Sequence, residues 1–143
     1  MAIKVLYTAN AIAKGGRNGH TQSDDGVVSV DLSVPQAAGG PGKAGTTTPE
    51  HLFAAGYAAC FGGACDVIAQ KLHLAPVSLE IDATVGFGPD SAGGYGLTVE
   101  LEMIAGGLSQ ADAQKIADAA HQICPYSKAT RGNVDVKIKA AVV

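Results

Sequence analysis

The chain has 143 residues and a formal net charge of −3, with 10 Lys and Arg against 13 Asp and Glu. Because the basic residues form no cluster, neither a nucleic-acid backbone nor an anionic membrane surface has an evident docking face. The composition is 47% hydrophobic and 16% charged, which is typical of a compact globule. The length suits a single domain of residues 1–143 with its own core.

Two further features concern the compartment. The longest uncharged apolar stretch, from Leu52 to Cys65, is shorter than the ~20 residues that span a bilayer, and residues 1–10 lack the charged-then-apolar layout of a signal peptide. We therefore expect a cytoplasmic protein without a membrane partner. Its three cysteines cannot all be paired, and a reducing cytosol disfavours permanent disulfides.

The first third of the chain predicts about three strands and then a loop. Ile3 to Ile12 has an extended, partly alternating pattern, and residues 20–22 and 27–34 flank the turn sequence SDDG as a hairpin. Residues 35–45 are rich in glycine and proline, so they leave the sheet as a loop or arm.

A long helix should follow this arm. Thr48 is a good N-cap, Pro49 suits the first helical position and Glu50 complements the helix dipole. The helix is predicted to run from about residue 49 to Leu72. Its apolar and small residues recur largely at three- and four-residue spacings, which predicts a helix buried on most sides.

The remaining pattern completes an α+β fold. Alternation over residues 77–87 and 97–103 predicts a second hairpin, and residues 134–140 form a final strand. Ser109, with Asp112 three residues on, starts a second helix, and Pro125 marks a kink or stop after Cys124. The order βββαββαβ indicates helices segregated against a largely antiparallel sheet.

The cysteines are the candidates for redox chemistry. Cys60 and Cys65 lie five apart on the predicted helix, which turns them about 140° from each other with Cα atoms roughly 8.7 Å apart. That exceeds the ~7 Å limit of a disulfide, so a disulfide within one chain would join Cys124 to Cys60 or to Cys65. Spacing does not choose between them, and a free cysteine in such a helix is often a small buried hydrophobe.

Residues 48–61 (TPEHLFAAGYAACF) and 124–133 (CPYSKATRGN) closely resemble the two signature segments of the organic hydroperoxide resistance proteins, one branch of the Ohr/OsmC family. The resemblance covers nearly the whole chain, including GGRNG at residues 15–19 and the glycine-rich arm. It departs at His51, where glutamine is expected, and at Lys128, where asparagine is common. It implies the Ohr/OsmC fold, with a long central helix and an intertwined homodimer.

In that family the cysteines of these two motifs are the peroxidatic and resolving thiols, which implies these roles for Cys60 and Cys124. Cys60 would attack an organic hydroperoxide, release an alcohol and become a sulfenic acid, with which Cys124 condenses. The resemblance also implies that a dihydrolipoyl group on a partner protein reduces the resulting disulfide, and that no bound cofactor or metal is required. Cys65 lies outside this set.

The family's arginine and glutamate correspond to Arg17 and Glu50. A cysteine with a pKa near ~8.5 is mostly protonated at neutral pH, so Arg17 is expected to lower the pKa of Cys60 and to orient the substrate. Glu50 is expected to hold that guanidinium in a bidentate pair. Without the family, a solvated loop charge and a helix-start carboxylate would explain these two residues equally well.

Glu50 and Cys60 cannot meet on one straight helix, because ten residues at 1.5 Å rise set them ~15 Å apart. Our hypothesis is that Glu50, together with Arg17, serves the Cys60 of a second copy. A two-fold homodimer would then build two shared active sites.

Three alternatives stay open. The first is a non-catalytic binding protein whose apolar cleft carries lipophilic molecules. The second is a zinc site, although His121 and Cys124 form the one local pair and the spacing of structural zinc is missing. The third is the sister OsmC-type branch, which residues 124–127 and the glycine-rich arm disfavour. Several aromatic residues could wall an apolar pocket, but core packing explains them equally well: Phe53, Tyr57, Phe61, Phe87 and Tyr95.

Overall fold

A computed structural model describes residues 2–143, and its contacts separate into two compact units. The first unit ends at Leu52, and the second comprises residues 53–143. Helix α1 (Pro49–Lys71) contributes residues to both. The single domain expected from the chain length therefore stays a prediction.

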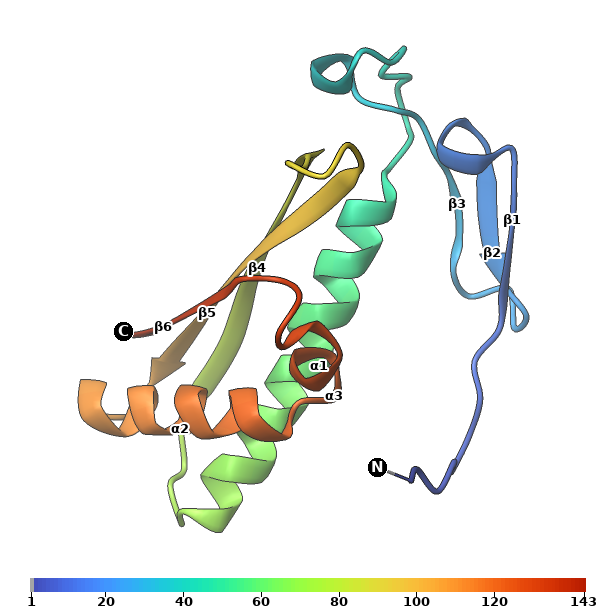
Figure 1. Cartoon of the computed structure of the whole chain (residues 1–143). Helices are drawn as coiled ribbons and strands as arrows, with labels where there is room; N and C mark the ends of the chain where they lie inside the picture. The colour runs from blue at the N-terminus through green and yellow to red at the C-terminus, as the bar shows by residue number, and fades with distance from the viewer. Residues whose placement is uncertain (1) are drawn as a thin grey trace. The chain divides into compact units, whose positions relative to one another are not determined.

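The first unit is a small antiparallel sheet followed by an irregular arm. Its strands β1 (Ala11–Lys14), β2 (His20–Ser23) and β3 (Ser29–Asp31) pair in sequence order (Figure 1). The β1–β2 turn holds a short 3-10 helix, Gly16–Asn18. Gly19 follows it, and a Cβ at Gly19 would lie 1.7 Å from the Lys14 carbonyl oxygen, so the turn requires glycine there.

The first predicted strand is wrong over most of its length. Of the stretch from Ile3 to Ile12, the strand β1 includes Ala11 and Ile12 only. The preceding segment is extended but carries exposed apolar side chains, with Leu6 at 85% and Tyr7 at 86% exposure. The apolar alternation predicted a strand, but within the described residues no strand forms a ladder with residues 2–10, and Asn10 accepts a single backbone hydrogen bond from Asp24 at 2.9 Å.

The second unit is built on one three-stranded sheet. Strands β4 (Ser78–Pro89) and β5 (Tyr95–Gly106) form the predicted hairpin, with Val85 opposite Val99 and Ile81 opposite Met103. Strand β6 (Val136–Val142) pairs in parallel with the other edge of β5. Alternate residues of β5 are fully buried, whereas Glu100 and its neighbours on the opposite face of the strand are more exposed. Successive side chains of a strand point to opposite faces, so one face of this sheet contributes to the core.

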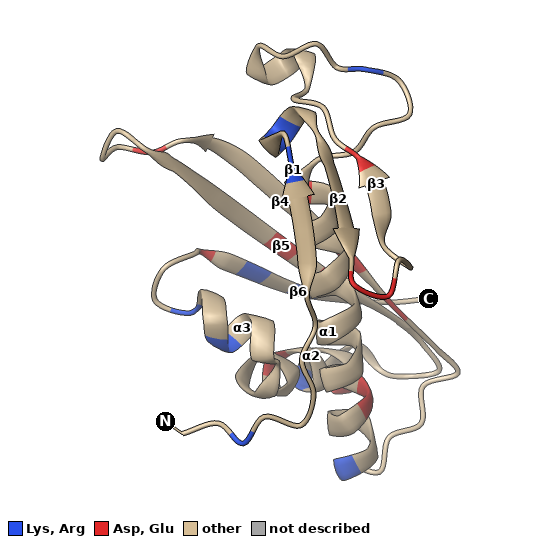
Figure 2. Ribbon diagram, turned by 90° about the vertical axis from the view of Figure 1, so that its right-hand side faces the viewer, with Lys and Arg blue, Asp and Glu red and all other residues tan. Residues whose placement is uncertain are grey.

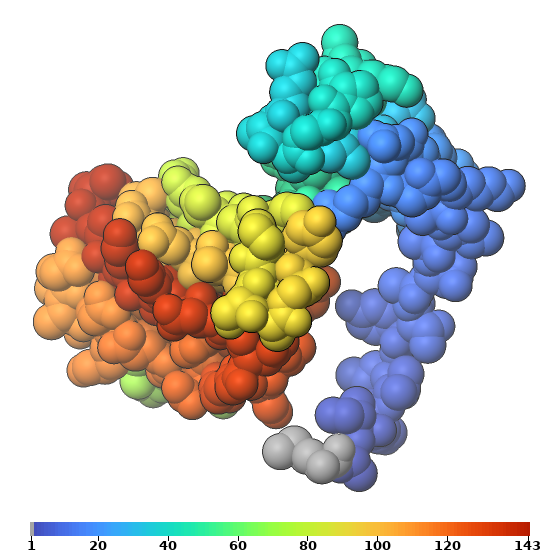
Figure 3. Space-filling model, turned by 45° about the horizontal axis from the view of Figure 1, so that its top comes forward, coloured from blue at the N-terminus to red at the C-terminus, as the bar shows by residue number. Residues whose placement is uncertain are grey.

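Both long helices contribute to that core. Buried side chains of α1 and of α2 (Gln110–Ile123) join the buried face of β5 in one cluster. Figure 3 shows α2, in orange, packed beside the red C-terminal segment, where α2 contacts β6. This is the α+β arrangement that the sequence predicts, and a short additional helix, α3 (Pro125–Thr130), precedes β6.

Helix α1 begins where its N-cap signal predicts. The Thr48 hydroxyl accepts a hydrogen bond from the His51 backbone N–H at 3.1 Å, and it also lies 2.7 Å from His51 Nδ1. His51, the departure from the family pattern, therefore supports the cap with both its backbone and its side chain. The helix ends at Lys71, one residue before the predicted end.

Burial of α1 is narrower than predicted. Its buried face comprises Tyr57, Phe61, Ala64, Cys65, Ile68 and Ala69. The small residues Ala55, Ala59 and Gly63 face solvent in the single chain. By length and composition alone, with a mean hydropathy of 1.5 over its most apolar window, α1 is able to cross a membrane. That is weak support for a membrane span, because core helices of soluble proteins pass the same test.

Charged residues are distributed over both units rather than gathered in one place (Figure 2). Lys137 and Glu100 form a cross-strand ion pair at 3.7 Å on the exposed face of the second sheet. Both side chains are about half exposed or more, so solvent screening leaves this pair little stabilising effect.

Candidate active site

Two of the three cysteines meet in the second unit. The Cys124 thiol lies 3.7 Å from the Cys60 sulfur, although the two residues are 64 positions apart in sequence. Cys60 lies on α1 and is partly exposed, whereas Cys124 is fully buried. Both are free thiols. Of the two partners that spacing left open for Cys124, the structure thus brings Cys60 within hydrogen-bonding distance.

The position of Cys124 follows from the proline after it. Residues before proline are disfavoured in the α region, and Cys124 has an extended conformation with φ −60° and ψ 124°. Its backbone N–H closes α2 on the Ala120 carbonyl at 2.9 Å, and its carbonyl accepts the Lys128 N–H at 2.9 Å as α3 begins. Pro125 occupies the first position of α3, where proline is favoured. The predicted stop is therefore a junction between two helices.

The surroundings of the two helix cysteines differ. Burial raises the pKa of Cys60, the backbone N–H of Tyr126 opposes that effect, and the neighbouring Cys124 adds to it. Burial, with smaller contributions from Asp66 and Cys124, raises the pKa of Cys65 to about 12. Cys65 is fully buried in the core cluster, which makes it a packing residue. The lowering of the Cys60 pKa by Arg17 stays a prediction.

Arg17 and Glu50 form the predicted bidentate pair within the first unit. Arg17 Nη1 donates to Glu50 Oε2 at 3.0 Å, and Nη2 donates to Oε1 at 2.8 Å. The hydrogen bond from Arg17 is the largest cause of the lowered pKa of Glu50, and the same bond raises the pKa of Arg17. Glu50 is mostly buried and Arg17 is 44% exposed. A guanidinium held in this way keeps a defined orientation.

A set of hydrogen-bonded polar side chains lies around Cys124, and sequence reasoning missed the set as such, although it named Tyr57 as an aromatic residue and His121 as a neighbour of Cys124. The Ser127 hydroxyl lies 2.8 Å from the Tyr57 hydroxyl and 2.8 Å from His121 Nδ1. Thr130 Oγ1 lies 3.3 Å from the Tyr57 hydroxyl. Burial and the nearby Arg131 lower the pKa of His121, which favours its neutral form. Only the spacing of His121 and Ser127, three residues before and after Cys124, could have drawn attention to them.

Aromatic rings surround part of this region. Tyr57 packs edge-on against Phe53 with ring centroids 5.9 Å apart, and it lies 5.7 Å from the ring of Tyr126. Tyr57 and Phe61 are fully buried, so core packing accounts for them, whereas Phe87 stacks on Tyr95 at 5.1 Å in the β4–β5 hairpin. None of these contacts assigns a substrate role to an aromatic residue.

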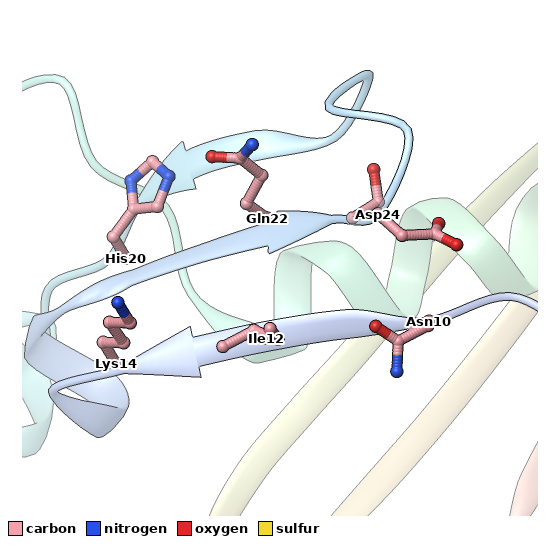
Figure 4. A pocket seen from close by; sticks show the side chains of 7 residues that line it. Asn10, Ile12, Lys14, His20, Gln22 and Asp24 are labelled. Carbon is pink, nitrogen blue, oxygen red and sulfur yellow. The ribbon is translucent and has the colours of Figure 1, made fainter.

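A separate hollow of about 370 Å³ lies on the first unit. Its lining includes Ile12 and Lys14 from β1 and His20 and Gln22 from β2 (Figure 4). His20 also contacts Asp31 Oδ1 at 2.7 Å. The hollow contains none of the four predicted catalytic residues. Within residues 2–143, no three His, Cys, Asp or Glu side chains are grouped so that they could hold a metal ion.

Comparison with known proteins connects this geometry to a family. The OsmC-like protein family matches residues 40–139. The organic hydroperoxide resistance protein of Xanthomonas axonopodis pv. citri (strain 306) is 51% identical over 140 residues, which cover 96% of each chain. OhrB of Bacillus subtilis (strain 168), with the same description, is 48% identical over 94% of this chain and 97% of its own.

Solved structures agree with the sequence matches. The crystal structure of an organic hydroperoxide resistance protein from Elizabethkingia anophelis has a TM-score of 0.92 and 42% identity, and the match covers 99% of this chain and 100% of that one. The chain therefore belongs to the OsmC family, in the branch of the organic hydroperoxide resistance proteins. The resemblance found from the sequence motifs is confirmed.

Proposed function

We propose that this chain is a thiol peroxidase that reduces organic hydroperoxides and so protects the cell against oxidative stress. The observation that carries the proposal is the 3.7 Å approach of the Cys60 and Cys124 sulfurs, in a chain whose relatives are named organic hydroperoxide resistance proteins. Paired thiols of unequal exposure suit a reaction in which the accessible one meets the substrate and the buried one follows.

The reaction begins at Cys60. Its thiolate attacks one peroxide oxygen, the O–O bond breaks, and the departing alkoxide takes a proton to become an alcohol. Cys60 is left as a sulfenic acid. The Cys124 sulfur then bonds to the Cys60 sulfur, and the sulfenic oxygen leaves as water with the hydroxyl and thiol protons. An external dithiol, a dihydrolipoyl group in our proposal, reopens the disulfide by thiol–disulfide exchange and is itself oxidised to a cyclic disulfide.

Arg17 and Glu50 supply the charge that this reaction needs. Because burial raises the pKa of Cys60, thiolate formation requires a cation beside the sulfur. The Arg17 guanidinium is permanently charged, and the bidentate pair with Glu50 orients it. In the proposed homodimer, the Arg17–Glu50 pair of one chain serves the Cys60 of its partner.

Exposed apolar surface supports a partner of the same kind. Ile3, Val5, Leu6 and Tyr7 of the extended N-terminal segment are between 67% and 86% exposed. Helix α1 adds an exposed row of small residues and Val67, which is 43% exposed. A surface of this kind is stable in water when another chain covers it, and an isologous dimer covers it twice. We place this dimer in the cytoplasm, where thiols stay reduced.

Turnover assays test the proposal. We expect the purified protein to consume tert-butyl hydroperoxide with dihydrolipoamide as reductant, and to do so far more slowly with glutathione. Cys60→Ser should reduce turnover to the rate without protein, whereas Cys65→Ser should keep it. Unchanged consumption by Cys60→Ser would contradict the assignment of the nucleophile, and equal rates with both reductants would contradict the dihydrolipoyl preference.

A further inference from the structure

A chain of buried hydroxyl groups links the two cysteine-bearing segments. It runs from the Tyr57 hydroxyl to the Ser127 hydroxyl and on to His121 Nδ1, with 2.8 Å at each step. Tyr57 and Ser127 are fully buried. We call Tyr57, Ser127 and His121 the hydroxyl link.

The hydroxyl link is placed symmetrically about the reacting sulfurs. Tyr57 lies three residues before Cys60, one turn earlier on α1. His121 and Ser127 lie three residues before and after Cys124, on α2 and α3. The link therefore connects one turn of α1 to both sides of the junction that holds Cys124.

The hydroxyl link sets a defined distance between α1 and the Cys124 junction, which apolar packing alone does not. Apolar packing holds helices together without direction, whereas hydrogen bonds between buried groups depend steeply on their geometry. Within the described residues, every buried side-chain nitrogen or oxygen has a hydrogen-bond partner. Thr130 adds to the anchoring, because its hydroxyl donates within α3 to the Tyr126 or Ser127 carbonyl, each 3.1 Å away.

The distance matters most after the first step of the reaction. Forming the disulfide requires the sulfurs to close from 3.7 Å to about 2.05 Å. Until they do, a second hydroperoxide can transfer an oxygen to the Cys60 sulfenic acid, which gives a sulfinic acid and a second alcohol. That product is a dead end. The fate of each turnover thus depends on how quickly Cys124 reaches Cys60.

We propose that Tyr57 and Ser127 are positioning residues for the resolving step, holding the Cys124 junction at the distance from which its sulfur displaces the sulfenic oxygen of Cys60. This inference rests on the proposed peroxidase function. Both side chains are fully buried, so we expect them to stay out of contact with the hydroperoxide and their removal to leave the first step intact. What changes is the partition of the sulfenic acid between disulfide and sulfinic acid.

Two variants break the link, one at its Tyr57 end and one at its centre. Tyr57→Phe keeps the ring and its packing, and Ser127→Ala removes the central hydroxyl. The matched control is Tyr95→Phe, which removes a hydroxyl from a tyrosine that is 73% exposed in the β4–β5 hairpin. Each protein is treated with increasing equivalents of tert-butyl hydroperoxide and quenched with an alkylating reagent, and the disulfide and sulfinic forms of Cys60 are counted by mass spectrometry.

In both variants we expect the rate of Cys60 oxidation to stay within about twofold of wild type. Sulfinic acid formed per turnover should rise at least about tenfold, the effect of losing the buried Tyr57–Ser127 hydrogen bond that the two variants have in common. Tyr95→Phe should match wild type. The double variant Tyr57→Phe/Ser127→Ala should resemble Ser127→Ala, because Ser127→Ala by itself already removes the bond to Tyr57 together with the bond to His121. Independent damage to folding would instead multiply the two effects.

The outcomes separate the two proposals. If wild-type Cys60 is not oxidised by the hydroperoxide, the peroxidase function fails and the positioning role fails with it. Suppose that wild type forms the disulfide and that both variants divide the Cys60 sulfenic acid between disulfide and sulfinic acid in the same ratio as wild type. The positioning role alone is then overturned. Equal slowing of oxidation and resolution, or multiplied effects in the double variant, would also overturn it.

Discussion

At the scale of single residues, the Arg17–Glu50 pair has the geometry that our proposed reaction uses, and its contribution to the stability of the fold is modest. The guanidinium meets both carboxylate oxygens, but its 44% exposure leaves the pair screened by solvent. We therefore expect substitutions here to affect the reaction far more than folding.

Arg17→Lys tests that expectation. Lysine keeps the charge but loses the planar fork, so we expect peroxide turnover to fall at least about tenfold while the free energy of unfolding changes by less than ~1 kcal/mol. Lys43→Arg, in the exposed arm, is the control and should match wild type. Wild-type turnover in Arg17→Lys would show that the bidentate geometry is dispensable.

Glu50→Gln gives a pH test of the same pair. Arg17 lowers the pKa of Glu50 below its ordinary value of 4.5. The pair therefore stabilises the fold above that value, and its contribution is lost as the pH falls through the lowered pKa. In urea denaturation between pH 7 and pH 3, wild type should lose slightly more stability than Glu50→Gln. A steeper loss in the variant would contradict the direction of the shift.

Cys65 differs from these residues, because our proposal gives it no part in the reaction. Its pKa of about 12 keeps it protonated well above neutral pH, so iodoacetamide should label Cys60 in the folded protein and reach Cys65 only after denaturation. Because its folded pKa exceeds the ordinary 9.0, stability falls as the pH rises from 9 towards 12. Rapid labelling of native Cys65 would show that the core is open there.

Sequence patterns found the residues that carry motifs and missed those that act through tertiary contact. Cys60, Cys124, Arg17 and Glu50 stand in segments with a recognisable family pattern. Ser127 stands in such a segment too, yet its partner Tyr57 lies 70 positions away. A hydrogen bond between residues so far apart depends on how α1 and α3 pack, and a local sequence pattern does not predict that packing.

At the scale of elements, helix starts were predictable because their signals are local. Thr48 and Ser109 each accept the backbone N–H three residues on, His51 and Asp112, at 3.1 Å. The segment from Ile3 was not predictable in the same way, because a strand exists only when another strand pairs with it. Helix α3 was missed because its six residues are too few to show a period.

The cap of α2 can be tested directly. Ser109→Ala leaves the Asp112 N–H without its side-chain acceptor, so we expect the free energy of unfolding to fall by about 1 kcal/mol. Urea denaturation measures it, with Ser91→Ala in the exposed β4–β5 turn as the control. Equal stability of the two variants would show that the cap contributes nothing.

At the scale of the whole molecule, the sequence predicted that α1 is buried on most sides, whereas the single chain leaves Ala55, Ala59 and Gly63 exposed. The sequence pattern correctly predicted that α1 is apolar, but it could not show whether the same chain or a second chain covers the apolar surface of this helix. In our proposal a second copy does so, and shared active sites follow from the ~15 Å of helix between Glu50 and Cys60.

A mixed dimer tests the shared sites. When Cys60→Ser and Glu50→Ala chains are refolded together, a heterodimer keeps one site with both groups intact. Random mixing should restore about a quarter of wild-type turnover, measured with tert-butyl hydroperoxide and dihydrolipoamide. Turnover no better than that of either parent would place Glu50 and Cys60 of one site in the same chain, or remove Glu50 from the reaction.

The central claim, a two-cysteine peroxidase, is tested most directly by non-reducing peptide mass spectrometry after one equivalent of tert-butyl hydroperoxide. Wild type should yield a Cys60–Cys124 disulfide, and Cys124→Ser should trap Cys60 as a sulfenic or higher acid. Three unmodified cysteines in wild type would make the thiols structural and contradict the account.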